Sequence, residues 1–177
     1  MDENKEPLIN DDMFLVDVED PDSGETFSTL SISRTPAMLL SFAANKFTEA
    51  ASKYFNESLG LGTVDWRMLL LLARTPGVTS VQAAQTIGVD KGTVSRSVSR
   101  LSKNELIQLG VLHSNGRSRG LTLTPTGRVL HDRILAAALS QQAHLLVGFD
   151  PEEVSTLCNM LLRFMGNLDA LIERDRS

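Results

Sequence analysis

The segment DKGTVSRSVSRLSKN, residues 90–104, has the pattern of a short amphipathic helix with an unusual outer surface. Asp90 is a favourable residue for capping a helix N-terminus. Val94, Val98 and Leu101 recur at helical spacing, so we expect these three side chains to face a core. Four basic residues and no acidic residue lie between positions 91 and 104. Ordinary solvent-exposed helices usually mix in glutamates, so this composition favours an anionic partner.

The opposite side of this helix is predicted to contact DNA. Arginine makes bidentate bonds to guanine edges or to phosphate, and serine and threonine bond either partner at close range. Gly92 is expected to leave the backbone amide groups at the helix tip available to a phosphate. The predicted contact residues on this helix are Lys91, Thr93, Ser95, Arg96, Ser97 and Arg100.

Two shorter helices are predicted upstream of this segment. The stretch VDWRMLLLLA, residues 64–73, is nearly all apolar, as a short buried helix would be, and Pro76-Gly77 stops it. A second helix is predicted from about Ser80 to Ile87. Gly88 follows it and supplies the tight turn that a helix-turn-helix needs.

The residues downstream predict a β-hairpin. Leu106–Leu112 and Gly120–Leu123 have the composition of two strands, and a polar turn joins them. Three helices followed by a hairpin is the element order of a winged helix-turn-helix. The hairpin adds Arg117 and Arg119 to the predicted DNA-binding residues, because a small, cationic hairpin tip fits the narrow minor groove.

Long helices are predicted on both sides of this block. A capping residue followed by proline marks three helix starts, at Thr35-Pro36, Thr124-Pro125 and Asp150-Pro151. The first helix is expected to end near Leu59. The last helix is apolar over more than one stripe, which favours a helical dimer interface. The alternative is a central core helix of a monomer.

Charge is distributed unevenly along the chain. Residues 63–128 hold nine basic and three acidic side chains, whereas residues 1–35 hold ten acidic and two basic ones, and the whole chain has a net charge of −5. A basic block between acidic flanks is typical of a surface that contacts phosphates, because electrostatic attraction is local. Residues 1–35 are predicted to form a mobile acidic arm, with room for a short strand or turn around Met13–Val18.

Neither an enzyme nor a metal site is expected. The three histidines, His113, His131 and His144, share no metal-ligand spacing, and the single cysteine, Cys158, is expected to be a small buried hydrophobic residue. The sequence has no phosphate loop, nucleophile elbow or dinucleotide fingerprint, so no cofactor is expected. The lack of a long apolar run and of a basic N-terminal leader predicts a cytoplasmic protein without a membrane partner.

The pattern over residues 63–127 resembles the multiple antibiotic resistance regulator (MarR) family. The stretches that carry the resemblance are VDWRMLLLLA, VTSVQAAQTIGVDKGTVSRSVSRLSKNELI and LTLTPTGR, and DPEEVSTLCNMLLRFMGNL further along the chain also resembles the last helix of that family. It implies a mainly α fold with a small β-hairpin wing, in which residues 63–124 bind DNA and residues 36–62 and 125–177 form a helical dimerisation region. It places Thr93, Ser95 and Arg96 in the recognition helix and Arg117 at the wing. The family commonly has Asp where this chain has Asn115.

The function expected from these features is a homodimeric transcriptional regulator that binds double-stranded DNA at a palindromic operator. The resemblance implies a repressor that responds to a small-molecule effector. Two alternatives follow from the acidic residues 1–35. The winged fold could serve as a protein-interaction adaptor, or the acidic arm could mask the basic face and autoinhibit the regulator.

Overall fold

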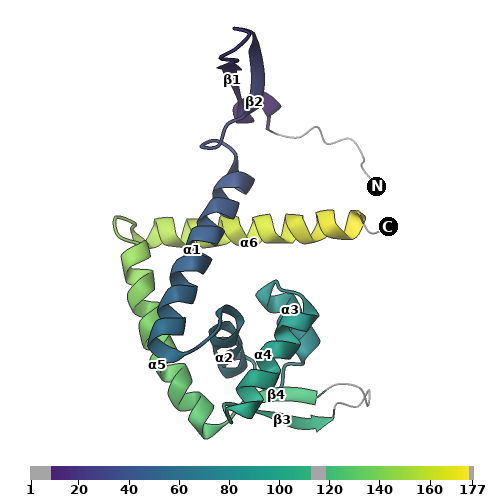
Figure 1. The fold of residues 1–177 in the computed structure, drawn as a ribbon, viewed down its shortest axis with the longest axis vertical. Coiled ribbons are helices and arrows are strands. Elements are labelled where there is room, and N and C mark those ends of the chain that lie inside the picture. Colours follow the sequence, from purple (N-terminus) through teal and green to yellow (C-terminus); the bar gives the residue numbers. More distant parts are fainter. Residues whose placement is uncertain (1–8, 113–118, 176–177) are drawn as a thin grey trace. The chain divides into compact units, whose positions relative to one another are not determined.

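The computed structural model describes residues 9–112 and 119–175, and the chain forms two compact units, Met1–Trp66 and Arg67–Ser177. The fold is mainly helical with a small antiparallel hairpin after the helix-turn-helix, as predicted, and the described residues contain a further hairpin within positions 15–30 (Figure 1). The first unit contains a 3-10 turn (η1), a hairpin, a long helix and the first turn of α2. The second unit contains the rest of α2 and the elements that follow. The elements are η1 Asp11–Phe14, β1 Leu15–Glu19, β2 Thr26–Leu30, α1 Pro36–Leu59, α2 Thr63–Arg74, α3 Ser80–Ile87, α4 Lys91–Lys103, β3 Ile107–Leu112, β4 Arg119–Leu123, α5 Pro125–Leu145 and α6 Pro151–Arg174.

Local capping chemistry sets the helix boundaries. The Thr124 hydroxyl accepts a hydrogen bond from the Gly127 amide at 3.0 Å and so starts α5. The Asp150 carboxylate accepts from two amides of the first turn of α6, and α1 ends at Gly60, whose φ of 65° lies in the left-handed region. Thr35 was expected to cap α1, and that prediction is wrong. Its hydroxyl instead donates to the Ser31 carbonyl at 2.7 Å.

The core of the second unit holds the helix-turn-helix in place. Helix α3 packs against α4, α4 contacts β3, and α3 and α5 contact β4. The capping box between Thr79 and Gln82 starts α3, and Gly88 ends it with a φ of 75°. The side chains at the centre of this core are less than 2% exposed; they are Met68, Leu69, Leu72, Val94, Ser97, Leu101, Leu121 and Ile134.

The wing consists of β3 and β4, paired antiparallel with Ile107 opposite Leu123 (Figure 1). Backbone hydrogen bonds also tie β4 to the turn after α2. The Gly77 amide donates to the Leu121 carbonyl at 2.8 Å, and the Leu121 amide donates to the Val78 carbonyl at 2.9 Å. The base of the wing is therefore fixed to the helical core.

Residues 9–35 are not an arm without structure, and the short strand that the sequence allowed around Met13–Val18 is present as β1, Leu15–Glu19. Strands β1 and β2 form an antiparallel hairpin with Leu15 opposite Leu30 and Glu19 opposite Thr26. The turn is stabilised by Asp20, whose carboxylate accepts hydrogen bonds from the amides of Asp22 and Ser23. These hydrogen bonds hold the pKa of Asp20 below its usual value. The hydrogen bonds of the Asp20 turn therefore help this segment to form a hairpin despite its high content of acidic residues.

Helix α6 has no buried residue, which contradicts the alternative of a central core helix. Cys158 is exposed, so its predicted burial is also wrong for the single chain. Within the described ranges, every helix is too short or too polar to cross a membrane. The large exposed apolar residues of α6 are Leu157, Met160, Leu162, Met165, Leu168, Leu171 and Ile172.

Candidate nucleic-acid interface

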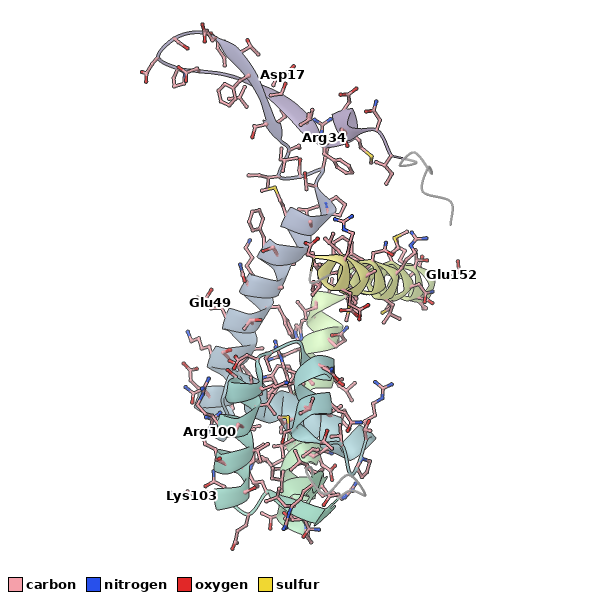
Figure 2. The ribbon with its side chains drawn as sticks, turned by 90° about the vertical axis from the view of Figure 1, so that its right-hand side faces the viewer. Asp17, Arg34, Glu49, Arg100, Lys103 and Glu152 are labelled. Carbon is pink, nitrogen blue, oxygen red and sulfur yellow. The ribbon has the colours of Figure 1, made fainter. Side chains whose placement is uncertain are left out.

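Helix α4 presents a cationic, carboxylate-free outer face to solvent. It begins at Lys91 and ends at Lys103, with Asp90 as its N-cap, as predicted. Arg100 and Lys103 lie along its last turns (Figure 2). The predicted contact residues that are exposed on α4 are Lys91, Ser95, Arg96 and Arg100, and Thr93 is half-buried.

Ser97 does not belong to this face. Its side chain is fully buried, at 0% exposure, so the prediction that it points outward is wrong. The reason is helical geometry, since residue 97 follows Val94 by three positions and precedes Leu101 by four. Both spacings place it on the core side of α4, while Val98 is only half-buried. Ser97 is therefore a packing residue between α4 and the core.

Three side chains at the start of α4 form a hydrogen-bonded chain. The Thr93 hydroxyl donates to Oδ2 of Asp90 at 2.6 Å and accepts from Nη2 of Arg96 at 2.8 Å. The Thr93 amide donates to Oδ1 of Asp90 at 2.8 Å. This chain directs the Arg96 guanidinium back toward the helix tip while leaving its other N–H donors for a ligand. The sequence predicts Asp90 only as a helix cap. The structure adds a second role, because Asp90 also holds Arg96 through Thr93.

Gly92 makes room for the Asp90 carboxylate, and an added side chain would only touch the Arg96 guanidinium. A Cβ atom added to Gly92 would lie 3.5 Å from Nη1 of Arg96 and 3.1 Å from Oδ1 of Asp90. The expectation that the tip amides are available to a phosphate is wrong for Thr93, because the Asp90 carboxylate already accepts from that amide. A carboxylate at this point also repels a phosphate. The arrangement favours recognition through the guanidinium over phosphate binding at the helix N-terminus.

The hydrogen bond from the Thr93 hydroxyl holds the pKa of Asp90 below its usual value, and the Thr93 amide and the nearby Arg96 charge act in the same direction. We expect an NMR titration of the side-chain carboxyl carbon to place the midpoint of Asp90 below 3.8. Since the folded-state pKa is the lower one, the cap stabilises α4 above the unfolded-state pKa and is lost as pH falls through the folded-state pKa.

Thr93→Val tests the cause of this shift, because valine removes the hydroxyl and keeps the backbone amide. The midpoint of Asp90 should rise toward 3.8 in this variant. A midpoint that stays unchanged would contradict the hydroxyl as the main cause.

The wing contributes Arg119, which is exposed at the first position of β4, opposite Leu112. Arg117 and Asn115 lie outside the described residues. Among the described residues, no group of three or more His, Cys, Asp or Glu side chains could hold a metal ion. Nδ1 of His131 lies 2.9 Å from Oδ1 of its neighbour Asp132.

Comparison with known proteins gives concordant matches. Residues 59–118 match the sequence model of the MarR family. A MarR/EmrR family transcriptional regulator from Acinetobacter sp. ADP1 is 25% identical, with a TM-score of 0.73, and the match covers 80% of this chain and 99% of that chain. Two further similar structures were solved with DNA. One is a MarR-family regulator from Listeria monocytogenes with a 26mer DNA, 22% identical over 76% of this chain and 89% of that chain, with a TM-score of 0.69. The other is FabT from Streptococcus pneumoniae, 20% identical over 76% of this chain and 96% of that chain, with a TM-score of 0.60.

Proposed function

We propose, since residues 59–118 match the sequence model of the MarR family, that this chain is a transcriptional regulator that binds double-stranded DNA as a homodimer. The observation that carries the proposal is the outer face of α4. Exposed basic side chains lie on it together with Arg96, which a hydrogen bond to Thr93 holds toward the start of the helix. A recognition helix reads base edges from the major groove with such side chains. DNA is present in the similar structures from Listeria monocytogenes and Streptococcus pneumoniae, which supports duplex DNA as the ligand.

The DNA-contact residues that we propose are Arg96 for base edges, Lys91, Ser95 and Arg100 for flanking phosphates, Arg119 of β4, and Arg117 from the segment outside the described residues. Thr93 acts as the link that orients Arg96. An arginine fork matches the two acceptors on the major-groove edge of guanine, whereas a lysine or serine that reaches a phosphate carries no sequence information. Ser97 is omitted because it is buried.

The homodimer is proposed to form through α6. This helix exposes a continuous apolar stripe and buries none of its residues within one chain. Contiguous exposed apolar surface of this kind is rare on monomers and marks an interaction site. A second copy is the occupant that we propose, because a twofold axis would also place two recognition helices on one palindromic operator.

Leu168→Glu should weaken this dimer. Leu168 lies on the apolar stripe, and in a twofold interface the substitution occurs twice, so each dimer must bury or expel two carboxylates. We expect the dissociation constant of the dimer to rise about 30-fold. Analytical ultracentrifugation over a concentration series measures it.

Asn159→Glu is the matched control, since Asn159 is exposed on the opposite, polar side of α6. It adds the same charge to the same helix and should leave the dissociation constant nearly unchanged. Equal effects of the two substitutions, or a wild-type protein that sediments as a monomer at all concentrations, would contradict the α6 interface.

Selection of bound fragments from the host genome tests the proposed function as a whole. We expect the selected fragments to share a palindrome. Its two half-sites should be protected from cleavage and should lie about one helical turn of DNA apart. A protein that enriches no fragment at physiological salt would instead be an adaptor, and the regulator proposal would fail.

We also propose that the bound dimer represses transcription and that a small-molecule effector releases it. An effector changes DNA affinity only if it binds the free and DNA-bound dimers with different affinity. Deletion of the gene should raise the transcription of genes beside the selected fragments. Lower transcription after deletion would identify an activator.

A further inference from the structure

The β1–β2 hairpin exposes both of its faces and at least one complete edge. Its strands belong to a sheet of two strands only, among the residues that the structure describes. Every side chain of β2 is exposed, as are Val16 and Val18 of β1. An isolated hairpin of two strands is marginally stable in water, and an unpaired edge is a template for another strand. This hairpin therefore has the features of a surface that gains stability from a partner.

The outer edge of β2 carries the free backbone groups. The Ser31 amide donates to the Phe14 carbonyl, and the Asp20 amide donates to the Glu25 carbonyl, which fixes the hydrogen-bonded pairs of the ladder. Because these pairs alternate along an antiparallel ladder, the amides and carbonyls of the intervening β2 residues point outward. Those residues are Thr26, Ser28 and Leu30.

The outer edge of β1 is partly occupied. The Arg34 guanidinium donates to the Leu15 carbonyl, which is one of the outward-pointing groups of that strand. Figure 2 shows Arg34 and Asp17 on this part of the chain. The edge of β2 is thus the longer continuous site for an added strand.

The two faces of the hairpin differ in chemistry. Val16, Val18 and Phe27 lie on one face, and Phe27 is 50% exposed. Asp17 and Glu19 lie on the other face. The Asp17 carboxylate leans toward β2, since it accepts a hydrogen bond from the Ser28 hydroxyl at 2.6 Å. Negative charge therefore lies close to the open edge.

The negative charge of residues 9–35 determines which class of molecule can bind at the edge of β2. Residues 9–35 carry seven acidic side chains and one basic one, so two hairpins of two copies would repel each other. The same repulsion excludes a nucleic acid. A strand with cationic side chains on the Asp17–Glu19 face and apolar ones on the Val16–Phe27 face would complement both faces, because side chains alternate along a strand with a period of two.

We propose that the outer edge of β2 docks an extended segment of a partner protein in which apolar and cationic residues alternate. The partner strand adds to the hairpin through the backbone groups of Thr26, Ser28 and Leu30. Its cations lie beside Asp17 and Glu19, and its apolar side chains cover Val18 and Phe27. On the function proposed above, this site recruits a protein to the regulator.

The test uses the full-length protein and three labelled peptides that alternate valine with lysine, glutamate or threonine. Fluorescence anisotropy measures the affinity of each peptide. We expect the lysine peptide to bind at least about tenfold more tightly than the other two, with the amide signals of β2 shifting in NMR spectra. A lysine peptide that binds no better than the glutamate peptide would overturn the proposal.

A comparison of Ser28→Pro with Ser28→Ala tests whether the peptide pairs with the backbone at the outer edge of β2. Both remove the hydroxyl, but only proline removes the outward amide, which the β1–β2 ladder does not use. Proline should weaken lysine-peptide binding about tenfold relative to alanine. Equal binding by the two variants would mean diffuse attraction to acidic residues and would overturn strand addition.

An N-methylated lysine peptide gives the same test without changing the protein, so the proposal stays falsifiable if Ser28→Pro unfolds the hairpin. It should bind about tenfold more weakly than the unmethylated peptide, because methylation removes its strand-pairing amides. The proposal is overturned if no peptide binds, and two further measurements then identify what occupies the edge of β2. A change in sedimentation of the Ser28→Pro variant would identify a second copy of the chain as the occupant. Tighter DNA binding by the same variant would identify the basic face of the chain itself as the occupant.

Discussion

Arg96→Ala should lower the affinity for the selected operator about 100-fold or more, with an unchanged dimer and unchanged thermal stability. Each lost bidentate contact costs about 1–3 kcal/mol, and a twofold dimer loses two of them. The side chain is exposed and donates to the exposed end of the Thr93 side chain, so its removal leaves no fully buried group unpaired. Electrophoretic mobility shift at fixed salt measures the affinity.

Two further variants separate the roles of charge and geometry at this position. Arg96→Lys keeps the charge but loses the guanidinium fork, so it should retain the salt dependence of binding while losing most of the discrimination between operator and random DNA. Lys103→Ala removes a cation from the last turn of the same helix and should weaken operator and random DNA by similar, small factors. Unchanged operator affinity in Arg96→Ala would mean that α4 is not the recognition helix.

The boundaries of the helix-turn-helix could be predicted because they depend on neighbouring residues in the sequence. Asp90 starts α4 by accepting from the Thr93 amide, and Gly88 ends α3 because its φ of 75° suits glycine. Thr35 shows the limit of such local rules. Its hydroxyl donates to the Ser31 carbonyl, four residues earlier, and accepts no capping hydrogen bond from the first turn of α1.

The core-facing residues of α4 were predicted less completely than its ends. Positions three and four residues after Val94 are both compatible with the buried face of a helix. Hydrophobicity favoured Val98 over Ser97, whereas the structure buries Ser97 fully and Val98 only in part. A small side chain suits a position where α4 packs closely, and the sequence of one helix does not reveal how closely its neighbours approach.

Two features of the structure could not be predicted from amino-acid composition, because each depends on specific side-chain contacts. The count of carboxylates in residues 1–35 suggested an arm without structure, yet the Asp20 side chain is used in the turn and strands of alternating residues flank it. The link from Asp90 through Thr93 to Arg96 was also missed, although each member lies three residues from the next, the spacing of neighbours on a helix. Both signals were present as local spacing and became visible only with side-chain geometry.

Gly127→Ala should destabilise the winged unit by about 3 kcal/mol, although alanine favours a helix more than glycine does. Gly127 lies in the first turn of α5, where an added Cβ would overlap the backbone carbonyl oxygen of Leu106. That oxygen has no freedom to move aside, because it accepts from the Thr124 amide at 3.1 Å. The Thr124 hydroxyl also donates to the Glu105 carbonyl at 2.6 Å. Relieving the overlap must therefore separate the start of α5 from the start of β3 and break these bonds.

Gly166→Ala is the control that makes this effect specific, because an added Cβ there meets no atom within 4 Å. Gly166 lies inside α6, so alanine should stabilise the protein by about 0.5–1 kcal/mol through helix propensity alone. Urea unfolding of both variants at one protein concentration gives the comparison, since the proposed dimer makes the unfolding midpoint depend on concentration. The two substitutions are chemically identical, so opposite signs can come only from the packing around each glycine. A Gly127→Ala protein as stable as the parent would mean that α5 does not approach Leu106 this closely.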